Sequence, residues 1–278
     1  MKLLILLFML MFIGCRSSKI AFEYDVYENR LPSVLLLFPS SNGKFEKLRS
    51  GLDTGAENCV FYNNAEEKIF GSKDYIKELC AKENINIDDM KADEVLFFEV
   101  NDIRCSKFLF TELWIKQTKD KGNGLDGLLG YKAFKDYGVI VFDFRKNILT
   151  IGKRKVSKNV FPMKIKRFDS FHTKLLTIPV EIDGKIIDVI LDTGFSSKGK
   201  YCLATDDWLD LQKKSCVKIG DIEYKNVEYV AFEDVNFANK LTQNNTKTLF
   251  KDCIILGNAF FKNHRIQLDF ENMTFAMD

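Results

Sequence analysis

The chain has 278 residues, of which 46% are hydrophobic and 29% charged, with a net charge of +2. This length and composition are those of a globular protein with one large or two modest domains, and they exclude a disordered chain. The balanced charge gives no electrostatic case for nucleic-acid binding, so we predict no nucleic-acid partner. The chain has only two histidines, His172 and His264, and most zinc and Ser-His-Asp chemistries therefore lack the residues they need.

The N-terminal segment has the pattern of a secretory signal. Lys2 is followed by an unbroken apolar run from Leu3 to Ile13, which is short for a membrane-spanning helix, and then by Gly14-Cys15. This pattern resembles the lipobox of bacterial lipoproteins. The resemblance implies that residues 1–14 are a signal peptide and that the lipidated Cys15 anchors an exported protein to a membrane, with residues 15–22 as a tether. A plain signal peptide and an uncleaved anchor are the alternatives, and the membrane face stays open.

Each half of the chain predicts a β-hairpin that ends in Asp-Thr-Gly. The first hairpin runs from Val34 through Asn42-Gly43 to Asp53, and the second runs from Leu176 through Asp183-Gly184 to Asp192. Asn-Gly and Asp-Gly favour tight hairpin turns, and the apolar alternation before Asp183 is typical of a strand with one buried face. The second strand of each hairpin therefore delivers an Asp-Thr-Gly triplet at its end.

The similarity between the two halves continues beyond the triplets. Residues 98–114 and 217–232 each predict a strand, a tight turn at Asn101-Asp102 or Gly220-Asp221, and a second strand. Three further landmarks follow in the same order in both halves: Leu128-Leu129-Gly130 and Ile255-Leu256-Gly257, Ala133-Phe134 and Ala259-Phe260, and Asp143-Phe144 and Asp269-Phe270. Such an ordered set indicates an internal duplication. We predict an N-terminal lobe over residues 23–155 and a C-terminal lobe over residues 156–278.

The halves differ in the segment that follows the triplet. The first half carries an extra stretch, about residues 63–92, in which Ser72 would cap a helix with one apolar face. The second half has only about residues 198–215 at that place. We therefore expect a mostly β fold with a few short helices.

This order of elements resembles the pepsin and retropepsin class of aspartic proteases, from about Val34 to the C-terminus. The resemblance implies two pseudo-symmetric, β-barrel-like lobes in one chain, and hence a monomer. It also implies roles for the repeated residues. Asp53 and Asp192 would be the catalytic pair; Thr54 and Thr193 would brace the loops across the lobe interface; Gly55 and Gly194 would take the turns; and Leu129-Gly130 and Leu256-Gly257 would support the loops from beneath.

Two facing carboxyls have a chemistry suited to the hydrolysis of peptide bonds. At close range they cannot both ionise, so they share one proton and titrate as a pair. One carboxyl then acts as general base on a water molecule while the other polarises the scissile carbonyl. This chemistry requires no metal or organic cofactor, the sequence has no Cys-x-x-Cys pair, and we predict neither kind of group. The predicted function is an aspartic endopeptidase acting on peptides or proteins.

Three features depart from the resemblance. Ala56 and Phe195 follow the two triplets, and we expect both to shape the pocket. The family prefers a small residue at the position of Phe195, so its ring would reshape the pocket or mark lost activity. Ser50-Gly51 precede Leu52 where a β-branched apolar pair is usual. No clear flap is found, and residues 85–96 are only a positional candidate for one. The alternative hypothesis is therefore a catalytically inactive, pepsin-like lipoprotein that binds peptide or another ligand between its lobes.

Overall fold

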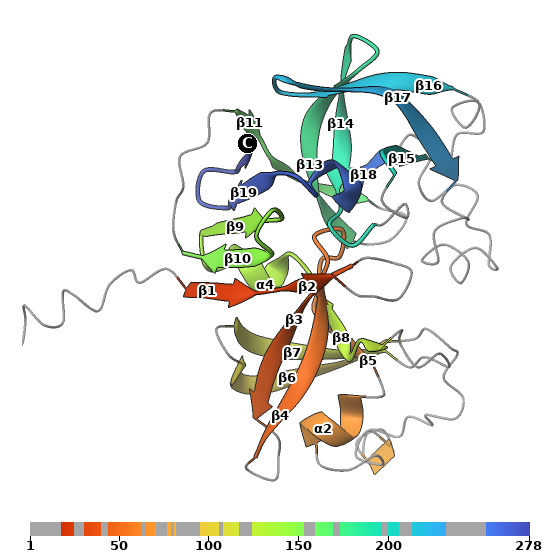
Figure 1. The fold of residues 1–278 in the computed structure, drawn as a ribbon. Helices are drawn as coiled ribbons and strands as arrows, with labels where there is room; N and C mark the ends of the chain where they lie inside the picture. The colour runs from red at the N-terminus through yellow and green to blue at the C-terminus, as the bar shows by residue number, and fades with distance from the viewer. Residues whose placement is uncertain are drawn as a thin grey trace, which may run out of the picture.

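The computed structural model describes residues 18–24, 31–39, 44–62, 65–70, 77–78, 81, 95–105, 108–116, 124–152, 159–168, 173–195, 200–205, 213–231 and 254–278. The described chain is mostly β and forms three sheets, one from each half and one shared (Figure 1). The mostly β prediction is confirmed. The predicted signal peptide and Cys15 lie outside the described residues. No helix within those residues has the length and apolar character needed to cross a bilayer.

The sheet of the first half has seven strands. Its order is β2 (Glu23–Tyr24), β3 (Pro32–Pro39), β4 (Phe45–Leu52), β8 (Gly127–Leu129), β5 (Val60–Tyr62), β7 (Phe108–Lys116) and β6 (Val95–Cys105). The β3–β4 hairpin is antiparallel, whereas β4 runs parallel to β8. Asp53 directly follows the last residue of β4, so the parallel pairing of β4 with β8 fixes the position of the first Asp-Thr-Gly.

The sheet of the second half repeats this arrangement strand for strand. Its order is β12 (Lys164–Phe168), β13 (Thr173–Ile182), β14 (Lys185–Leu191), β18 (Ile254–Leu256), β15 (Cys202–Thr205), β17 (Ile222–Ala231) and β16 (Lys214–Ile219). Here β14 runs parallel to β18, as β4 does to β8. The common topology supports the internal duplication expected from the sequence.

The third sheet takes three strands from each half. Its order is β1 (Ser18–Ala21), β10 (Ile148–Ile151), β9 (Val139–Asp143), β19 (Arg265–Asp269), β20 (Thr274–Met277) and β11 (Val160–Pro162). At its centre β9 and β19 are antiparallel, with Val141 opposite Gln267. These two positions are equivalent in the duplicated pattern, because each lies two residues before the matching Asp143 or Asp269. The pseudo-twofold relation of the halves therefore passes through this sheet.

The shared sheet corrects one expectation about the N-terminal segment. Residues 15–22 were expected to form a tether, but Ser18–Ala21 form β1, which pairs with β10 from Ser18 opposite Ile151 to Ala21 opposite Ile148. Backbone hydrogen bonding to an otherwise open sheet edge fixes these residues. The predicted lobe boundary at residues 155 and 156 lies outside the described residues.

The predicted tight turns are found in the second half. Asp183 and Gly184 join β13 to β14 with φ values of 49° and 79°, the left-handed pair that a two-residue hairpin turn requires. Gly220 and Asp221 likewise join β16 to β17. In these places the turn residues and the strand alternation point to the same structure. The turn predicted at Asn42-Gly43 lies outside the described residues.

The matching turn in the first half was predicted at the wrong place. Strand β6 continues through Asn101 and Asp102 to Cys105 before the chain returns as β7. The register of the pair shifts between Glu99 and Ile103, so a bulge accommodates the residues that were expected to turn. The polar pair Asn101-Asp102 is compatible with a tight turn or with a bulge, and the length of the partner strand β7 selects the bulge.

The described helices are short. They are α2 (Glu66–Phe70), α4 (Lys132–Lys135) and the 3₁₀-helix η9 (Asn258–Phe260). The predicted pairs Ala133-Phe134 and Ala259-Phe260 fall in α4 and η9, at equivalent points of the two halves. Most of the helix predicted after Ser72 lies outside the described residues.

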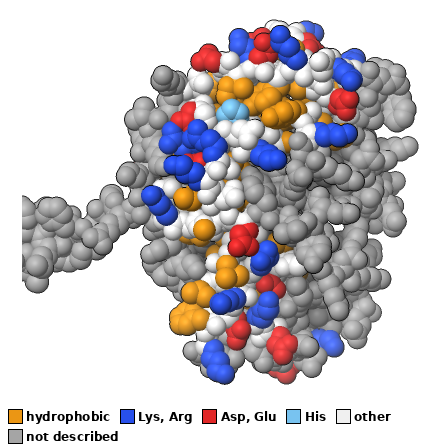
Figure 2. Space-filling model, viewed as in Figure 1, with side chains coloured by type: hydrophobic (Ala, Val, Ile, Leu, Met, Phe, Trp, Pro, Cys, Tyr) orange, Lys and Arg blue, Asp and Glu red, His pale blue; other side chains and the backbone are white. Residues whose placement is uncertain are grey.

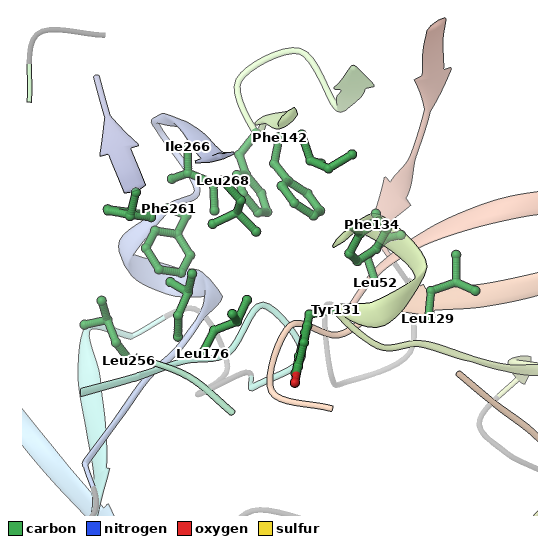
Figure 3. Close-up of a cluster of buried hydrophobic side chains, with 14 of the residues drawn as sticks. Leu52, Leu129, Tyr131, Phe134, Phe142, Leu176, Leu256, Phe261, Ile266 and Leu268 are labelled. Atoms are coloured by element: carbon green, nitrogen blue, oxygen red, sulfur yellow. The ribbon is translucent and has the colours of Figure 1, made fainter. Parts of the chain in front are cut away.

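One hydrophobic core joins the halves. Figure 3 shows Phe142 of the first half beside Ile266 and Leu268 of the second. Phe134 packs against Phe142 with the ring centroids 5.8 Å apart, and all of these side chains are buried. Burial of each such side chain contributes roughly 1.5–3 kcal/mol to folding. On the surface, charged side chains of both signs are interspersed with apolar ones over the face shown in Figure 2.

Candidate active site

The two aspartates of the repeated triplets occupy equivalent positions at the ends of two strands. The N–H of Asp53 donates to Leu129 O and the N–H of Asp192 donates to Leu256 O, both at 3.0 Å. These bonds arise because β4 and β14 each run beside a parallel strand, with Leu52 opposite Leu129 and Leu191 opposite Leu256. The supporting leucines thus lie directly beside the residues before the aspartates.

The threonines of the triplets join the two loops. The N–H of Thr193 donates to Thr54 Oγ1 at 3.0 Å, and the N–H of Thr54 donates to Thr193 Oγ1 at 3.1 Å. Each hydroxyl then donates to a strand of the other half, Thr54 to Leu191 O at 2.9 Å and Thr193 to Leu52 O at 2.8 Å. Both threonines are fully buried, so these four bonds form without competition from water.

The glycines of the triplets allow each loop to lie against the opposite carboxyl. A Cβ at Gly55 would lie 2.3 Å from Asp192 Cγ, and a Cβ at Gly194 would lie 2.6 Å from Asp53 Cγ. Neither glycine has a positive φ. The sequence predicted that they serve the turn, whereas the structure requires them for space. Any side chain here would push the two carboxyls apart.

The two carboxyls are hydrogen-bonded to each other. Burial raises the pKa of Asp53 well above its ordinary value of 3.8, and the charge of Asp192 and the hydrogen bond to it raise the pKa further. Burial also raises the pKa of Asp192, but the hydrogen bond from Asp53 opposes that effect. Both carboxyls therefore resist ionisation, and Asp53 does so more strongly.

Backbone N–H groups hold both carboxyls. Asp192 Oδ1 accepts the N–H groups of Gly194 at 2.7 Å and Phe195 at 2.8 Å. Asp53 Oδ1 accepts the N–H of Gly55 at 2.9 Å, and the backbone of Ala56 also lowers the pKa of Asp53. N–H donors lower the pKa of a carboxyl by stabilising its charged form, so they oppose the effect of burial on both sides. Asp53 is the more buried of the two residues.

Phe195 lies in the core of the second half. Its ring is 4% exposed and packs in a small cluster with Phe168, Leu175 and Ile255 among others. A Cβ at Gly257 would lie 2.3 Å from Phe195 Cδ1, so the ring occupies the space that this glycine leaves. The expectation that the ring shapes an open pocket is not met, because a side chain this buried presents almost no surface to a ligand.

The residues after the triplets are fixed in equivalent ways in the two halves. Phe195 O accepts the N–H of Asn258 at 2.9 Å, and Ala56 O accepts the N–H of Tyr131 at 2.9 Å. A Cβ at Gly130 would lie 2.8 Å from Ala56 O, so this glycine allows the close approach of the first loop. Each Leu-Gly segment therefore touches the loop that the sequence paired with it.

Two neighbours of the site, Tyr62 and Glu57, were not singled out from the sequence. Tyr62 at the end of β5 is close enough to Asp53 that the aspartate charge, together with the larger effect of burial, raises the pKa of Tyr62 to about 12. Glu57 contacts the second half and is treated below. Only Glu57 had a signal in the sequence, as an acid beside a catalytic motif.

The candidate flap over residues 85–96 is described only at its last two positions, Val95 and Leu96. Among the described residues, no group of three His, Cys, Asp or Glu side chains is placed to hold a metal ion.

Comparison with known proteins identifies the fold. No protein-family model matches the sequence, and no curated protein sequence matches it. The structure is similar to that of the aspartic proteinase from Irpex lacteus, with a TM-score of 0.53 and 10% sequence identity. The similarity covers 94% of this chain and 97% of that one. It confirms the predicted pepsin-like arrangement of two β lobes, and at this identity it bears on fold alone.

Proposed function

We propose that this pepsin-like chain is an aspartic endopeptidase that hydrolyses peptide bonds with Asp53 and Asp192. One observation carries the proposal: two hydrogen-bonded carboxyls with raised pKa values face each other at the point where the two halves meet. Buried carboxyls that share a proton are costly, because burial disfavours the charged member. Such pairs cluster at functional sites, where the perturbed pKa serves proton transfer.

In the proposed mechanism the pair holds one proton, which starts on Asp53 because its pKa is raised more strongly, and each carboxyl has a role in the first step. The Asp192 carboxylate removes a proton from a water molecule as the water oxygen bonds to the peptide carbonyl carbon. Asp53 gives its proton to the carbonyl oxygen, whose π bond breaks. The product is a neutral tetrahedral diol, with the dyad still holding one proton, now on Asp192.

The second step reverses the proton movement. Asp192 gives its proton to the amide nitrogen, the C–N bond breaks, and Asp53 takes back a hydroxyl proton as the carboxylic acid forms. The dyad returns to its starting state with one proton on Asp53. One water molecule is consumed and no covalent intermediate forms. The N–H groups of Gly194 and Phe195 stabilise the Asp192 carboxylate at the start and end of the cycle.

The binding-only alternative loses its main support. It rested on Phe195, whose ring would have filled the pocket beside Asp192. Because that ring is 4% exposed and its N–H donates to Asp192 Oδ1, Phe195 supports the carboxyl instead of blocking it. A folded protein that neither cleaves peptides nor binds a transition-state mimic would restore the alternative.

Peptide cleavage by single-carboxamide variants tests the proposed enzyme. Asp53→Asn and Asp192→Asn each remove the shared proton chemistry with little change of shape, and each is expected to lower kcat by about 10²–10⁴-fold. Asp221→Asn, an exposed turn residue, is the matched control. A statine-type peptide should inhibit the wild type. If cleavage survives both dyad substitutions in folded protein, the assignment of the dyad is wrong.

We further propose that the protein is exported and held at a membrane through lipid on Cys15. The support is the apolar run from Leu3 to Ile13 followed by Gly14-Cys15. Only Arg16 and Ser17 separate Cys15 from β1, so a lipid there would hold the folded protein close to the bilayer. Cys15→Ser should move the protein from the membrane fraction to the soluble fraction. Unchanged fractionation would contradict the anchor and leave the enzyme proposal intact.

A further inference from the structure

Glu57 joins the first Asp-Thr-Gly loop to the second half of the molecule. Its Oε2 accepts the hydroxyl of Thr173 at 3.2 Å and the N–H of Lys174 at 2.7 Å. Glu57 lies four residues after Asp53, whereas Thr173 and Lys174 begin β13. The contact therefore ties the loop that carries one aspartate to a strand of the other lobe.

The other carboxylate oxygen is held by the first half. Lys132 Nζ lies 3.3 Å from Glu57 Oε1 and also donates to Asn58 Oδ1 at 2.8 Å. The N–H of Lys132 donates to Glu57 O at 3.2 Å. The Glu57 side chain is 13% exposed, so its ion pair is less screened than a pair on the open surface. One carboxylate thus bridges α4 of the first lobe and β13 of the second.

The place of this bridge matters for the separation of the two aspartates. Strand β13 forms the hairpin with β14, whose last residue precedes Asp192. Glu57 therefore connects the segment after Asp53 with the hairpin that presents Asp192. The shared sheet and the hydrophobic core join the halves as whole units, and the four threonine hydrogen bonds join the loops themselves. A local rotation of one loop about the threonines would change the distance between the carboxyls. The Glu57 contacts lie away from the threonines and oppose that rotation.

We infer that Glu57 is a positioning residue, whose contacts with β13 hold the two Asp-Thr-Gly loops at the separation where their carboxyls face each other. The inference rests on the proposed peptidase function and deepens it. Glu57 transfers no proton itself and acts only through the geometry of the dyad. A displacement of about 1 Å at a reacting group can cost about 10²-fold in rate, so the effect is measurable.

Kinetics of four variants form the first part of the test. Glu57→Ala removes both ties, Glu57→Gln keeps an oxygen for β13 but loses the charge that pairs with Lys132, and Thr173→Val removes one donor. Glu228→Ala is the control, because it removes an ion pair with Lys214 that joins β16 to β17 within one lobe. Glu57→Ala should lower kcat roughly 10–100-fold with KM within about twofold of wild type. Glu57→Gln should recover part of the loss, and the control should match wild type.

Titration of the dyad without substrate forms the second part. Carbon-13 NMR of labelled aspartate carboxyls in the full chain follows the apparent pKa values of the Asp53–Asp192 pair. The interaction between two charges weakens with distance, so in Glu57→Ala the higher of these values should move toward that of an ordinary aspartate. Glu228→Ala should titrate as the wild type does.

The two readouts separate the inference from the function on which it rests. Wild-type kcat and an unchanged dyad titration in folded Glu57→Ala and Thr173→Val would overturn the inference. A lower kcat that only follows lost stability, with the titration unchanged, would overturn it as well. If the wild type cleaves no peptide but Glu57→Ala shifts the titration, the proposed function fails and the positioning role stands. If Glu57→Ala does not fold, Thr173→Val and Glu57→Gln carry the same test.

Discussion

The hydroxyl oxygens of Thr54 and Thr193 each accept the backbone N–H of the other residue, at 3.0 and 3.1 Å. The two residues are 139 positions apart in the chain, and both are fully buried. Each hydroxyl also donates to a strand of the opposite half. The loops are therefore joined by a closed set of bonds in which both threonine hydroxyls and both threonine N–H groups pair with the other half.

Loss of one threonine hydroxyl is expected to destabilise the whole molecule. Thr54→Val keeps the shape of the side chain but leaves Leu191 O and the N–H of Thr193 buried without partners. At about 1–3 kcal/mol for each group, the free energy of unfolding should fall by roughly 2–4 kcal/mol. Urea denaturation measures this loss. Thr54→Ser keeps the hydroxyl and should lose less than about 1 kcal/mol; equal stability of the two variants would contradict the prediction.

A methyl group on a triplet glycine is expected to separate the carboxyls. The Cβ of Gly55→Ala would lie 2.4 Å from Asp192 Oδ2, which forces one loop to move. Peptide cleavage should fall by about 10²-fold or more, because the displaced carboxyls no longer act on one water molecule. Gly152→Ala is the control: nothing lies within 4 Å of its Cβ, although its φ of 74° costs some stability. Full activity of Gly55→Ala would show that the loops tolerate wider spacing.

Stability should fall with rising pH because of Asp53. Burial and the charge of Asp192 raise the pKa of Asp53 in the folded state above its ordinary value of 3.8. A carboxyl whose folded pKa is raised contributes stability that is fully present below the unfolded pKa and is lost as pH rises through the folded pKa. Asp53→Asn carries no charge at any pH, so its Tm should exceed that of wild type near pH 7 and match it near pH 3.

A control separates this effect from a general change of charge. Asp221→Asn, in the exposed turn between β16 and β17, should leave Tm within about 2 °C of wild type at both pH values. Thermal unfolding followed by circular dichroism measures all three proteins. A Tm difference between Asp53→Asn and wild type that is independent of pH would contradict the assignment of the proton to Asp53.

Phe195 is expected to matter for stability far more than for specificity. Phe195→Ala removes a ring that is 4% exposed in a packed cluster, and should lower the free energy of unfolding by about 3–5 kcal/mol. The N–H bond to Asp192 does not depend on the side chain, so kcat of the folded fraction should stay within about twofold of wild type. Phe195→Leu should be milder in stability. A change of preferred peptide side chain in Phe195→Leu would instead support a ring that shapes the pocket.

The sequence predicted those features that local chemistry specifies. Asp183-Gly184 forms the predicted tight turn because few residue pairs adopt two consecutive positive φ values. The mostly β fold followed from strand alternation and the repeated order of landmarks. The same logic failed at Asn101-Asp102, where the two polar residues suit either a turn or a bulge and the long β7 strand selects the bulge.

Other expectations failed because they depend on partners distant in sequence. Ser18–Ala21 were expected in a tether, since four residues carry too little pattern to show that they complete a sheet with β10. The position of Phe195 near Asp192 in the chain predicts a residue of the pocket, but chain position alone does not determine where the ring points. The sequence alone does not indicate the role of Glu57, because its partner Thr173 lies more than a hundred positions away.

The sequence by itself determined the repeated strand-loop units and the pair of Asp-Thr-Gly triplets, because turn chemistry and side-chain periodicity act over a few residues. Only the tertiary structure decided how the units meet: the shared six-stranded sheet, the glycines packed against the opposite carboxyls, and the raised pKa of Asp53. Those outcomes depend on burial and on distances between residues of different halves. The free energies of burial and of interaction between charges of the two halves arise only when the folded chain brings the halves together.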